Sequence, residues 1–373
     1  MYLGSVARRS LLLAGAGLGL ASGMFTNLRL ASAQALTGAP PEVDQLAVWV
    51  VTDSFQHQLM PSGKSGDVMV NRTGLVLSQG QPRALRNEWG LSLHLESKRG
   101  AETRQVLADF GFTGNALIHN LDLLGIDPSK LDAMLLTHGH YDHFGGMADF
   151  LAIHGKKLKA DLPFYIGGEE CFCARESGPP NAPLSFGILD RRAIEGAGIR
   201  IVLADRPASL AGHGFTTGSI PRISFEKPAQ PTRMRIGQQP DGLGCSPDSV
   251  APDKRTATVL PDDFQHEQAT CFNVKGKGLV VLTSCGHRGI VNSVQTAIKL
   301  SGGMKLHAVV GGFHLMPMPD EYVRETANAL KELKPDYLIP MHCSGLAFYE
   351  AAKQEMPGRV LLSSTGTRFT FGG

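Results

Sequence analysis

Four potential metal ligands fall within the six residues 138–143 of this 373-residue chain, where a predicted strand gives way to a helix. His138 and His140, two residues apart, can point the same way from an extended strand end, and Asp142 and His143 follow the bend. Imidazoles with one carboxylate and no required thiolate suit zinc first, then iron or manganese. A histidine-rich surface loop explains the cluster less well, because an apolar run precedes it and a glycine pair follows. The segment therefore predicts a metal site.

Three further histidines stand shortly after other predicted strands. His287, His314 and His342 each lie in a turn that contains glycine. Loops at the carboxyl ends of strands are where α/β proteins usually place active-site groups. For one histidine alone, a structural hydrogen bond is an equally good explanation. Three histidines at equivalent positions after strands are better explained as side chains that complete the metal site.

The rest of the chain alternates short apolar runs with helical periodicity. Strands are predicted at 47–52, 75–78, 91–96, 105–108, 133–137, 269–274, 278–283, 306–310 and 337–340, and helices at 115–124, 147–154, 290–300 and 320–333. Residues 213–263 hold seven prolines among many polar residues and predict a long irregular insert, typical of lids and binding loops. Two strand-rich halves, each followed by helices, predict one mixed α/β layered domain over residues 46–373.

Residues 1–33 have the pattern of an export signal. The pair Arg8-Arg9 precedes an apolar stretch at 11–25 that is shorter than the ~20 residues needed to span a bilayer, which disfavours a membrane anchor. Small residues before position 34 suit a signal peptidase. The arginine pair resembles a twin-arginine signal. We therefore expect the twin-arginine export machinery as a partner, a periplasmic or otherwise exported location, and no stable membrane insertion after signal removal. Residues 34–45 would be a lead-in linker.

The charge balance argues against nucleic acid or a membrane surface as a partner. The chain has 36 basic and 34 acidic residues, and loss of Arg8, Arg9 and Arg29 with the signal changes the net charge from +2 to −1. So balanced a chain has no electrostatic attraction for a polyanion. A small-molecule substrate is the expected partner.

The six cysteines are too few and too scattered for a small disulfide scaffold. Cys171 and Cys173 have no matching second pair, so a loop or core position is a better interpretation than a metal site. Outside the cytoplasm a disulfide is possible, but its pairing is open. Cys285 and Cys343 adjoin candidate ligands and are expected as buried small residues rather than as ligands.

The run His138-x-His140-x-Asp142-His143 resembles the signature of the metallo-β-lactamase superfamily, with His287 and His342 where its later single-histidine motifs occur. Residues 88–92, 138–146, 218–222, 286–292, 311–315 and 342–345 further resemble one branch, often labelled 7,8-dihydropterin-6-yl-methyl-4-(β-D-ribofuranosyl)aminobenzene 5′-phosphate synthase. The resemblance implies an α/β fold, the αβ/βα four-layer metallo-β-lactamase sandwich, with metals at one edge.

The resemblance also implies two ligand sets. His138, His140 and His287 would hold a first metal, and Asp142, His143 and His342 a second. Most dinuclear members carry a bridging Asp where this chain has His314, so the resemblance leaves open whether one ion or two are bound. Glu88, Asp109 and Asn292 also match the branch, and we expect them to be structural polar groups near the site.

A metal bound here would lower the pKa of its water toward ~7 and polarise the bond to be cleaved. Asp142 would orient the resulting hydroxide or ligate the second ion. His314 would donate a proton or stabilise negative charge, an outer-shell hydrogen bond being the alternative. Arg222 and Arg288 would contact an anionic substrate or, as arginines more often do, support the fold.

The leading hypothesis is an exported metal-dependent hydrolase that attacks an ester, phosphoester or lactam-like bond. The branch label gives a second hypothesis, a transferase joining a pterin precursor to a ribosylated aminobenzene phosphate. An export signal argues against it, because such substrates are cytoplasmic. The third hypothesis is a metal-binding protein without catalysis.

Overall fold

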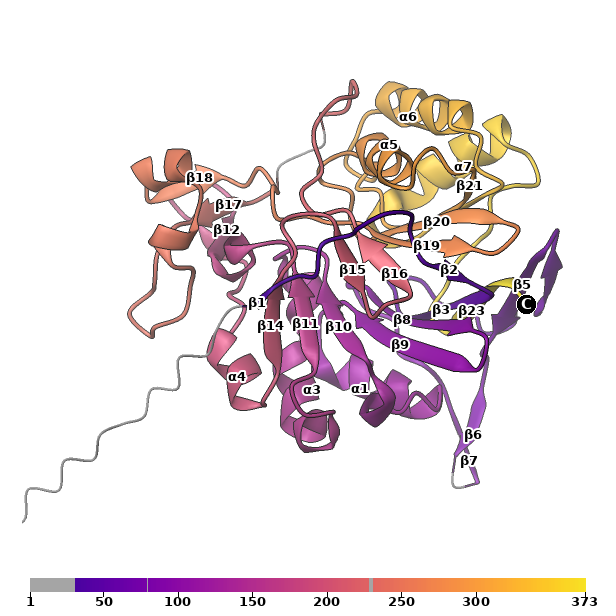
Figure 1. Ribbon diagram of the computed structural model, residues 1–373, viewed down its shortest axis with the longest axis horizontal. Coiled ribbons are helices and arrows are strands. Elements are labelled where there is room, and N and C mark those ends of the chain that lie inside the picture. Colours follow the sequence, from indigo (N-terminus) through magenta and orange to yellow (C-terminus); the bar gives the residue numbers. More distant parts are fainter. Residues whose placement is uncertain (1–30, 79, 228–230) are drawn as a thin grey trace, which may run out of the picture.

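Two mixed β-sheets pack face to face in this computed structural model, which describes residues 31–78, 80–227 and 231–373 (Figure 1). Across the first sheet the strands are β1 (Ala31–Ser32), β14 (Arg200–Leu203), β11 (Pro163–Ile166), β10 (Ala133–Leu136), β9 (Glu102–Ala108), β8 (Ser92–Arg99), β3 (Gln45–Thr52), β23 (Thr367–Gly372), β5 (Val68–Arg72) and β4 (Gly63–Ser65). The strands from β1 to β9 are parallel, and the pairs from β9 to β4 are antiparallel.

The second sheet carries the later half of the chain. Its strands are β15 (Ala208–Leu210), β16 (Gly214–Thr216), β19 (Thr270–Val274), β20 (Gly278–Thr283), β21 (Leu306–Gly311) and β22 (Tyr337–Pro340), with β2 (Glu42–Val43) beside β19. From β20 to β22 the strands are parallel. Parallel neighbours bring their carboxyl ends to one edge, and three of the predicted site histidines follow β20, β21 and β22 there.

Helices cover the outer face of each sheet. The helices are α1 (Gly114–Leu123), α2 (Tyr141–Phe144), α3 (Met147–His154), α4 (Arg191–Gly196), α5 (Ile290–Leu300), α6 (Asp320–Glu332) and α7 (Gly345–Glu355). One apolar cluster fills the space between the sheets, a second lies under α1, α3 and α4, and a third under α5, α6 and α7. Figure 1 shows the two helical layers on opposite sides. The predicted four-layer αβ/βα sandwich is confirmed.

The predicted elements between 91 and 340 match observed ones, because their apolar periodicity reports local burial. The strand predicted at 75–78 is β6 (Val76–Ser78), but it pairs only with β7 (Gln81–Arg83), outside the two large sheets. The prediction did not include β23, although its alternating buried residues Thr367, Phe369 and Phe371 carry the period-2 signal of a strand.

Part of the segment 213–263, predicted as irregular, is regular. It begins with β16 of the second sheet, and later β17 (Arg233–Arg235) and β18 (Val259–Pro261) join β12 (Ala174–Ser177) and β13 (Leu184–Ser185) in a separate sheet (Figure 1). A disulfide between Cys173 and Cys245 ties this small sheet to the loop that follows β17. Pairing with a distant strand supplies the order that local composition lacks.

The predicted export signal lies outside the described residues, apart from its last three. Those three form the short edge strand β1 and the residue after it, hydrogen-bonded to β14. Within the part of the chain that is described, no helix combines the length and the apolarity that crossing a bilayer needs.

Candidate metal centre

Three histidines from two distant segments form the first ligand set. His138 and His140 follow β10, and His287 lies in the turn between β20 and α5. One ligand atom from each lies within 4.8 Å of the others. All three rings are buried, and both ring nitrogens of His287 lack a hydrogen-bond partner among the described residues.

Asp142, His143 and His342 form the second ligand set, again with ligand atoms within 4.8 Å of one another. The Asp142 Oδ2 atom lies 3.4 Å from His342 Nε2 and 3.7 Å from His143 Nε2. The rings of His138 and His143 are 4.2 Å apart between centroids, so the two sets adjoin. The structure thus brings together all six side chains that the sequence predicts as ligands.

Burial controls the protonation of these groups. Burial, reinforced by neighbouring histidines, holds the pKa of His138 and of His287 well below the usual value. Burial also lowers the pKa of His140 to about 3, although Asp142 acts in the opposite direction. Burial would raise the pKa of Asp142, but the adjacent His143 and His342 hold it below its usual value. The first set therefore consists of neutral imidazoles, the form that binds metals. In the second set Asp142 is ionised, and although burial acts in the opposite direction, Cys343 and Asp142 raise the pKa of His342 to about 9, so this histidine must lose its proton to bind a metal.

A buried carboxylate anchors each ligand-bearing segment. Asp109 accepts hydrogen bonds from His143 Nδ1 at 2.7 Å and from the Thr137 main-chain N–H at 2.8 Å. Glu267 accepts from the main-chain N–H of His287 at 2.8 Å, and Asp53 accepts from that of His342 at 3.0 Å. These contacts fix the orientation of the ligands, as outer-shell groups do in metal sites.

Of these three anchors, the sequence analysis identified only Asp109. Asp53 and Glu267 carry no local signal beyond standing near a strand end. The other two predicted polar groups also stabilise turns. Glu88 accepts from the main-chain N–H groups of Phe112 and Thr113, and Asn292 accepts from those of residues 223 and 224.

Backbone strain gathers at the same place. Seven described non-glycine residues have positive φ, and they include Asp109 at 60°, His314 at 48° and His342 at 50°. Left-handed backbone at residues other than glycine is uncommon and concentrates at functional sites. Gly139, between the first two ligands, has no room for a side chain, because a Cβ there would lie 2.5 Å from the Arg175 guanidinium.

His314 lies beside the first set, with its ring centroid 4.1 Å from that of His287. Neither of its ring nitrogens has a hydrogen-bond partner within the described residues, so the alternative role of an outer-shell hydrogen bond is not observed. Arg222 and Arg288 donate to main-chain carbonyls, both of them to that of Asp263. Their contacts are those of residues that support the fold.

The small sheet and the loop after it cover the first set from outside. Thr232 Oγ1 lies 2.9 Å from His140 Nε2, and the Phe264 ring stacks on His287 at 4.0 Å between centroids. Sequence reasoning did not find these two residues, because nothing in the local pattern links them to histidines many residues away. They exclude water from the imidazoles.

A cavity of about 360 Å³ adjoins the second set and includes His342 in its wall. Its lining is mainly apolar, with Phe55, Trp89, Met316 and Leu346 exposed by 36% or more. The Trp89 ring centroid lies 4.9 Å from that of His342. A small molecule held there would contact the second ligand set directly.

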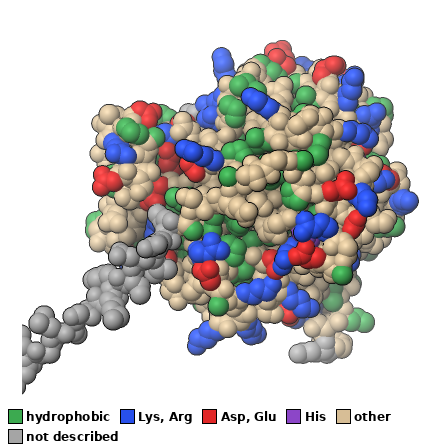
Figure 2. Space-filling model, in the orientation of Figure 1, with side chains coloured by type: hydrophobic (Ala, Val, Ile, Leu, Met, Phe, Trp, Pro, Cys, Tyr) green, Lys and Arg blue, Asp and Glu red, His purple; other side chains and the backbone are tan. Residues whose placement is uncertain are grey.

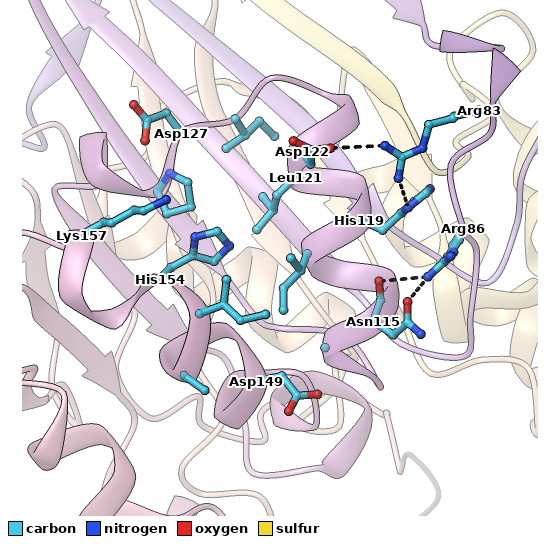
Figure 3. Close-up of a pocket in the computed structure, with 16 residues that line it drawn as sticks. Arg83, Arg86, Asn115, His119, Leu121, Asp122, Asp127, Asp149, His154 and Lys157 are labelled. Carbon is cyan, nitrogen blue, oxygen red and sulfur yellow. Dashed lines mark hydrogen bonds and ion pairs between the residues drawn. The ribbon is translucent and has the colours of Figure 1, made fainter. Parts of the chain in front are cut away.

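A second cavity, of about 780 Å³, lies between α1 and α3 and shares no residue with the ligand sets (Figure 3). Several of its polar groups bond to one another. Arg83 lies 3.1 Å from His119 Nδ1 and 3.6 Å from Asp122, and Arg86 bonds to Asn115. His154, also in its lining, has two buried ring nitrogens without a hydrogen-bond partner among the described residues.

The ligand sets fit a divalent metal. His138 Nε2, Asp142 Oδ1 and both nitrogens of His287 and His342 are buried and lack a hydrogen-bond partner in the described parts of the chain. A buried polar atom without a partner costs free energy, and a cation bound at each set would satisfy these atoms. Imidazole and carboxylate donors suit zinc, iron or manganese.

Comparison with known proteins agrees with this centre. Residues 100–162, which include the histidine run, match the family model of the metallo-beta-lactamase superfamily. The chain is 30% identical over 265 residues to a Methanocaldococcus jannaschii protein named 7,8-dihydropterin-6-methyl-4-(beta-D-ribofuranosyl)-aminobenzene-5'-phosphate synthase, covering 69% of this chain and 82% of that protein. The chain belongs to the metallo-β-lactamase superfamily.

Two other similarities support this membership. An uncharacterized protein of the same archaeon is 26% identical, over 65% of this chain and 80% of its own length. The crystal structure of Tm1679, described as a metal-dependent hydrolase of the β-lactamase superfamily, superimposes with a TM-score of 0.61 at 22% identity, over 87% of this chain and 98% of that one. The second similarity establishes the metallo-β-lactamase fold. Members of this superfamily generally bind metals and are generally enzymes.

Proposed function

We propose that this metallo-β-lactamase superfamily protein is a zinc-dependent hydrolase of a small molecule with an apolar or aromatic group next to an ester, phosphoester or lactam-like bond. The observation that supports it is the contact between the second ligand set and the apolar cavity through His342. The cavity would bind the apolar group and place the adjoining bond at the centre. Acidic and basic side chains are interspersed on the face in Figure 2, which fits a small-molecule substrate better than a polyanion.

When bound, the metal would activate a water molecule and polarise the bond under attack. Asp142 would ligate the second ion or orient that water through Oδ1, an atom with no hydrogen-bond partner among the described residues. His314, whose ring nitrogens are likewise unpartnered, would protonate the leaving group or stabilise its negative charge. Trp89 and Met316 would exclude water around the bound group.

The test is hydrolysis of a chromogenic panel of aryl esters, aryl phosphodiesters and a lactam, with metal content measured in parallel. We expect turnover by the zinc-loaded protein and its loss in His140→Ala. His154→Ala is the matched control, because this histidine lies in the second cavity and outside both ligand sets. Equal turnover by wild type and His140→Ala would refute the proposal.

The Methanocaldococcus jannaschii relative favours a second candidate function, a transferase that acts on a pterin and a ribosylated aminobenzene phosphate. The apolar cavity would suit a planar ring as well as an aryl ester. Formation of the joined product from the two precursors, without turnover of the chromogenic panel, would replace the hydrolase proposal by this one.

We also propose that the chain is exported through the twin-arginine machinery to the periplasm or beyond. The paired Arg8 and Arg9 support this, and so does the Cys173–Cys245 disulfide, since disulfides persist mainly outside the cytoplasm. Fractionation of cells that express the full chain should recover it outside the cytoplasm. A variant with both arginines changed to lysine should stay inside. Equal export of both would contradict the twin-arginine route.

A further inference from the structure

One cysteine lies between the two ligand sets. The Cys285 Sγ atom is 3.3 Å from His143 Nε2, and ligand atoms of Cys285, His138 and His143 lie within 4.8 Å of one another. His138 belongs to the first set and His143 to the second. Cys285 is only 2% exposed, so its sulfur faces this space rather than solvent.

The nitrogens that face this sulfur are available for a metal. His143 uses Nδ1 for Asp109, which leaves Nε2 toward Cys285. His138 Nε2 is buried and unpartnered within the described residues. Zinc binds nitrogen at 2.0–2.1 Å and sulfur at about 2.3 Å, which in a tetrahedron puts the two donors about 3.5 Å apart. The observed 3.3 Å agrees with donors to one ion.

We propose that Cys285 is an additional metal ligand, a thiolate that joins the two sets. The proposal rests on the metal centre of the proposed function, and it changes the sequence-based expectation that Cys285 is only a neighbour of ligands. Because thiolates select soft or borderline metals, Cys285 makes the centre prefer zinc to manganese.

Cys343 has a different place. Its Sγ lies 3.3 Å from that of Cys285 and 3.2 Å from the main-chain nitrogen of His314, which donates to it. It shares a ligand group with Cys285 and His314, but with no member of either ligand set. Cys343 is therefore a positioning residue that holds the Cys285 sulfur through an S–H contact.

The test uses the full chain loaded with cobalt(II) and no substrate. We expect a sulfur-to-cobalt charge-transfer band in the near ultraviolet for wild type, and its retention in Cys343→Ser. In Cys285→Ser the band should disappear while the cobalt ligand-field bands remain. Cys271→Ser is the matched control, because Cys271 is a fully buried free cysteine in β19, outside every candidate ligand group.

Retention of the band in Cys285→Ser, or bound cobalt without the band in wild type, would overturn the proposal and leave the proposed function standing. Absence of cobalt binding in wild type would instead refute the metal centre itself. If Cys285→Ser does not fold, X-ray absorption of the zinc-loaded Cys343→Ser protein tests the proposal instead, because this variant keeps Cys285 and removes the neighbouring sulfur. A sulfur scatterer at about 2.3 Å supports Cys285 as a ligand, and nitrogen and oxygen scatterers alone overturn it.

Discussion

The two ligand sets are built from similar residues but differ in charge. The first consists of three imidazoles whose pKa values burial lowers, with no carboxylate among them. The second has Asp142 within 3.4 Å of His342 Nε2 and 3.7 Å of His143 Nε2. Both sets leave buried polar atoms without hydrogen-bond partners among the described residues, but without metal only the second set contains a carboxylate that can balance a protonated histidine.

This difference indicates how strongly each set depends on a cation. A metal at the first set satisfies unpartnered nitrogens without displacing an ion pair. A metal at the second set must replace an interaction that already exists. We therefore expect the ion at the first set to bind more tightly than the ion at the second set. The experiments below test this order of affinity.

The largest effect is expected from loss of a first-set ligand. With one equivalent of zinc, His287→Ala should no longer retain the ion. Its turnover should fall roughly a thousandfold, which corresponds to about 4 kcal/mol of lost transition-state stabilisation. Asp142→Ala should keep that one ion. Elemental analysis after gel filtration measures the zinc content of both variants. Retention of the ion in His287→Ala and its loss in Asp142→Ala would reverse the order.

The second prediction concerns the metal-free protein. Asp142→Ala should lower the free energy of unfolding by about 3 kcal/mol, because it leaves buried histidines without their counter-charge. His287→Ala should change it by about 1 kcal/mol or less, since lost stacking on Phe264 is offset by removal of two unpartnered nitrogens. Denaturant unfolding in the presence of a chelator compares them. Equal losses would show that the sets do not differ in this way.

The anchoring carboxylates allow the sets to be weakened one at a time. Asp53→Asn should weaken binding at the second set through the turn of His342, and Glu267→Gln should weaken binding at the first set through the turn of His287. Outer-shell changes of this kind cost about 10–100-fold in metal affinity. Competition with a chromophoric chelator measures each ion. An identical pattern in both variants would mean that the sets bind as one unit.

The smallest effect is expected at the cavity beside the second set. Trp89→Ala should raise KM for an aryl ester about tenfold, as expected for ~1.4 kcal/mol of lost contact, with metal content unchanged. Leu184→Ala is a suitable control, since this exposed leucine lies outside the cavity. A wild-type KM in Trp89→Ala would place the substrate elsewhere.

Much of the fold and all six proposed ligands could be predicted from the sequence. The strands and helices that were predicted between residues 91 and 340 follow from apolar periodicity, which is a property of neighbouring residues, but β11, α4 and β14 are not among them. The spacing from His138 to His143 indicates a metal site because the strand end and the bend determine where these side chains point. Histidines after β20, β21 and β22 are informative for the same reason, since each follows a recognisable strand.

Other features depend on contacts between segments that are distant in sequence. Asp53 holds the turn of His342 from 289 residues away, and Cys173 pairs with Cys245 across 72 residues. Thr232, Phe264 and Glu267 contact His140 and His287 only once the small sheet and the second large sheet are in place. The sequence by itself therefore determined which residue types could bind a metal. Only the tertiary structure decided how they are anchored and covered, because those contacts depend on chain packing and not on local spacing.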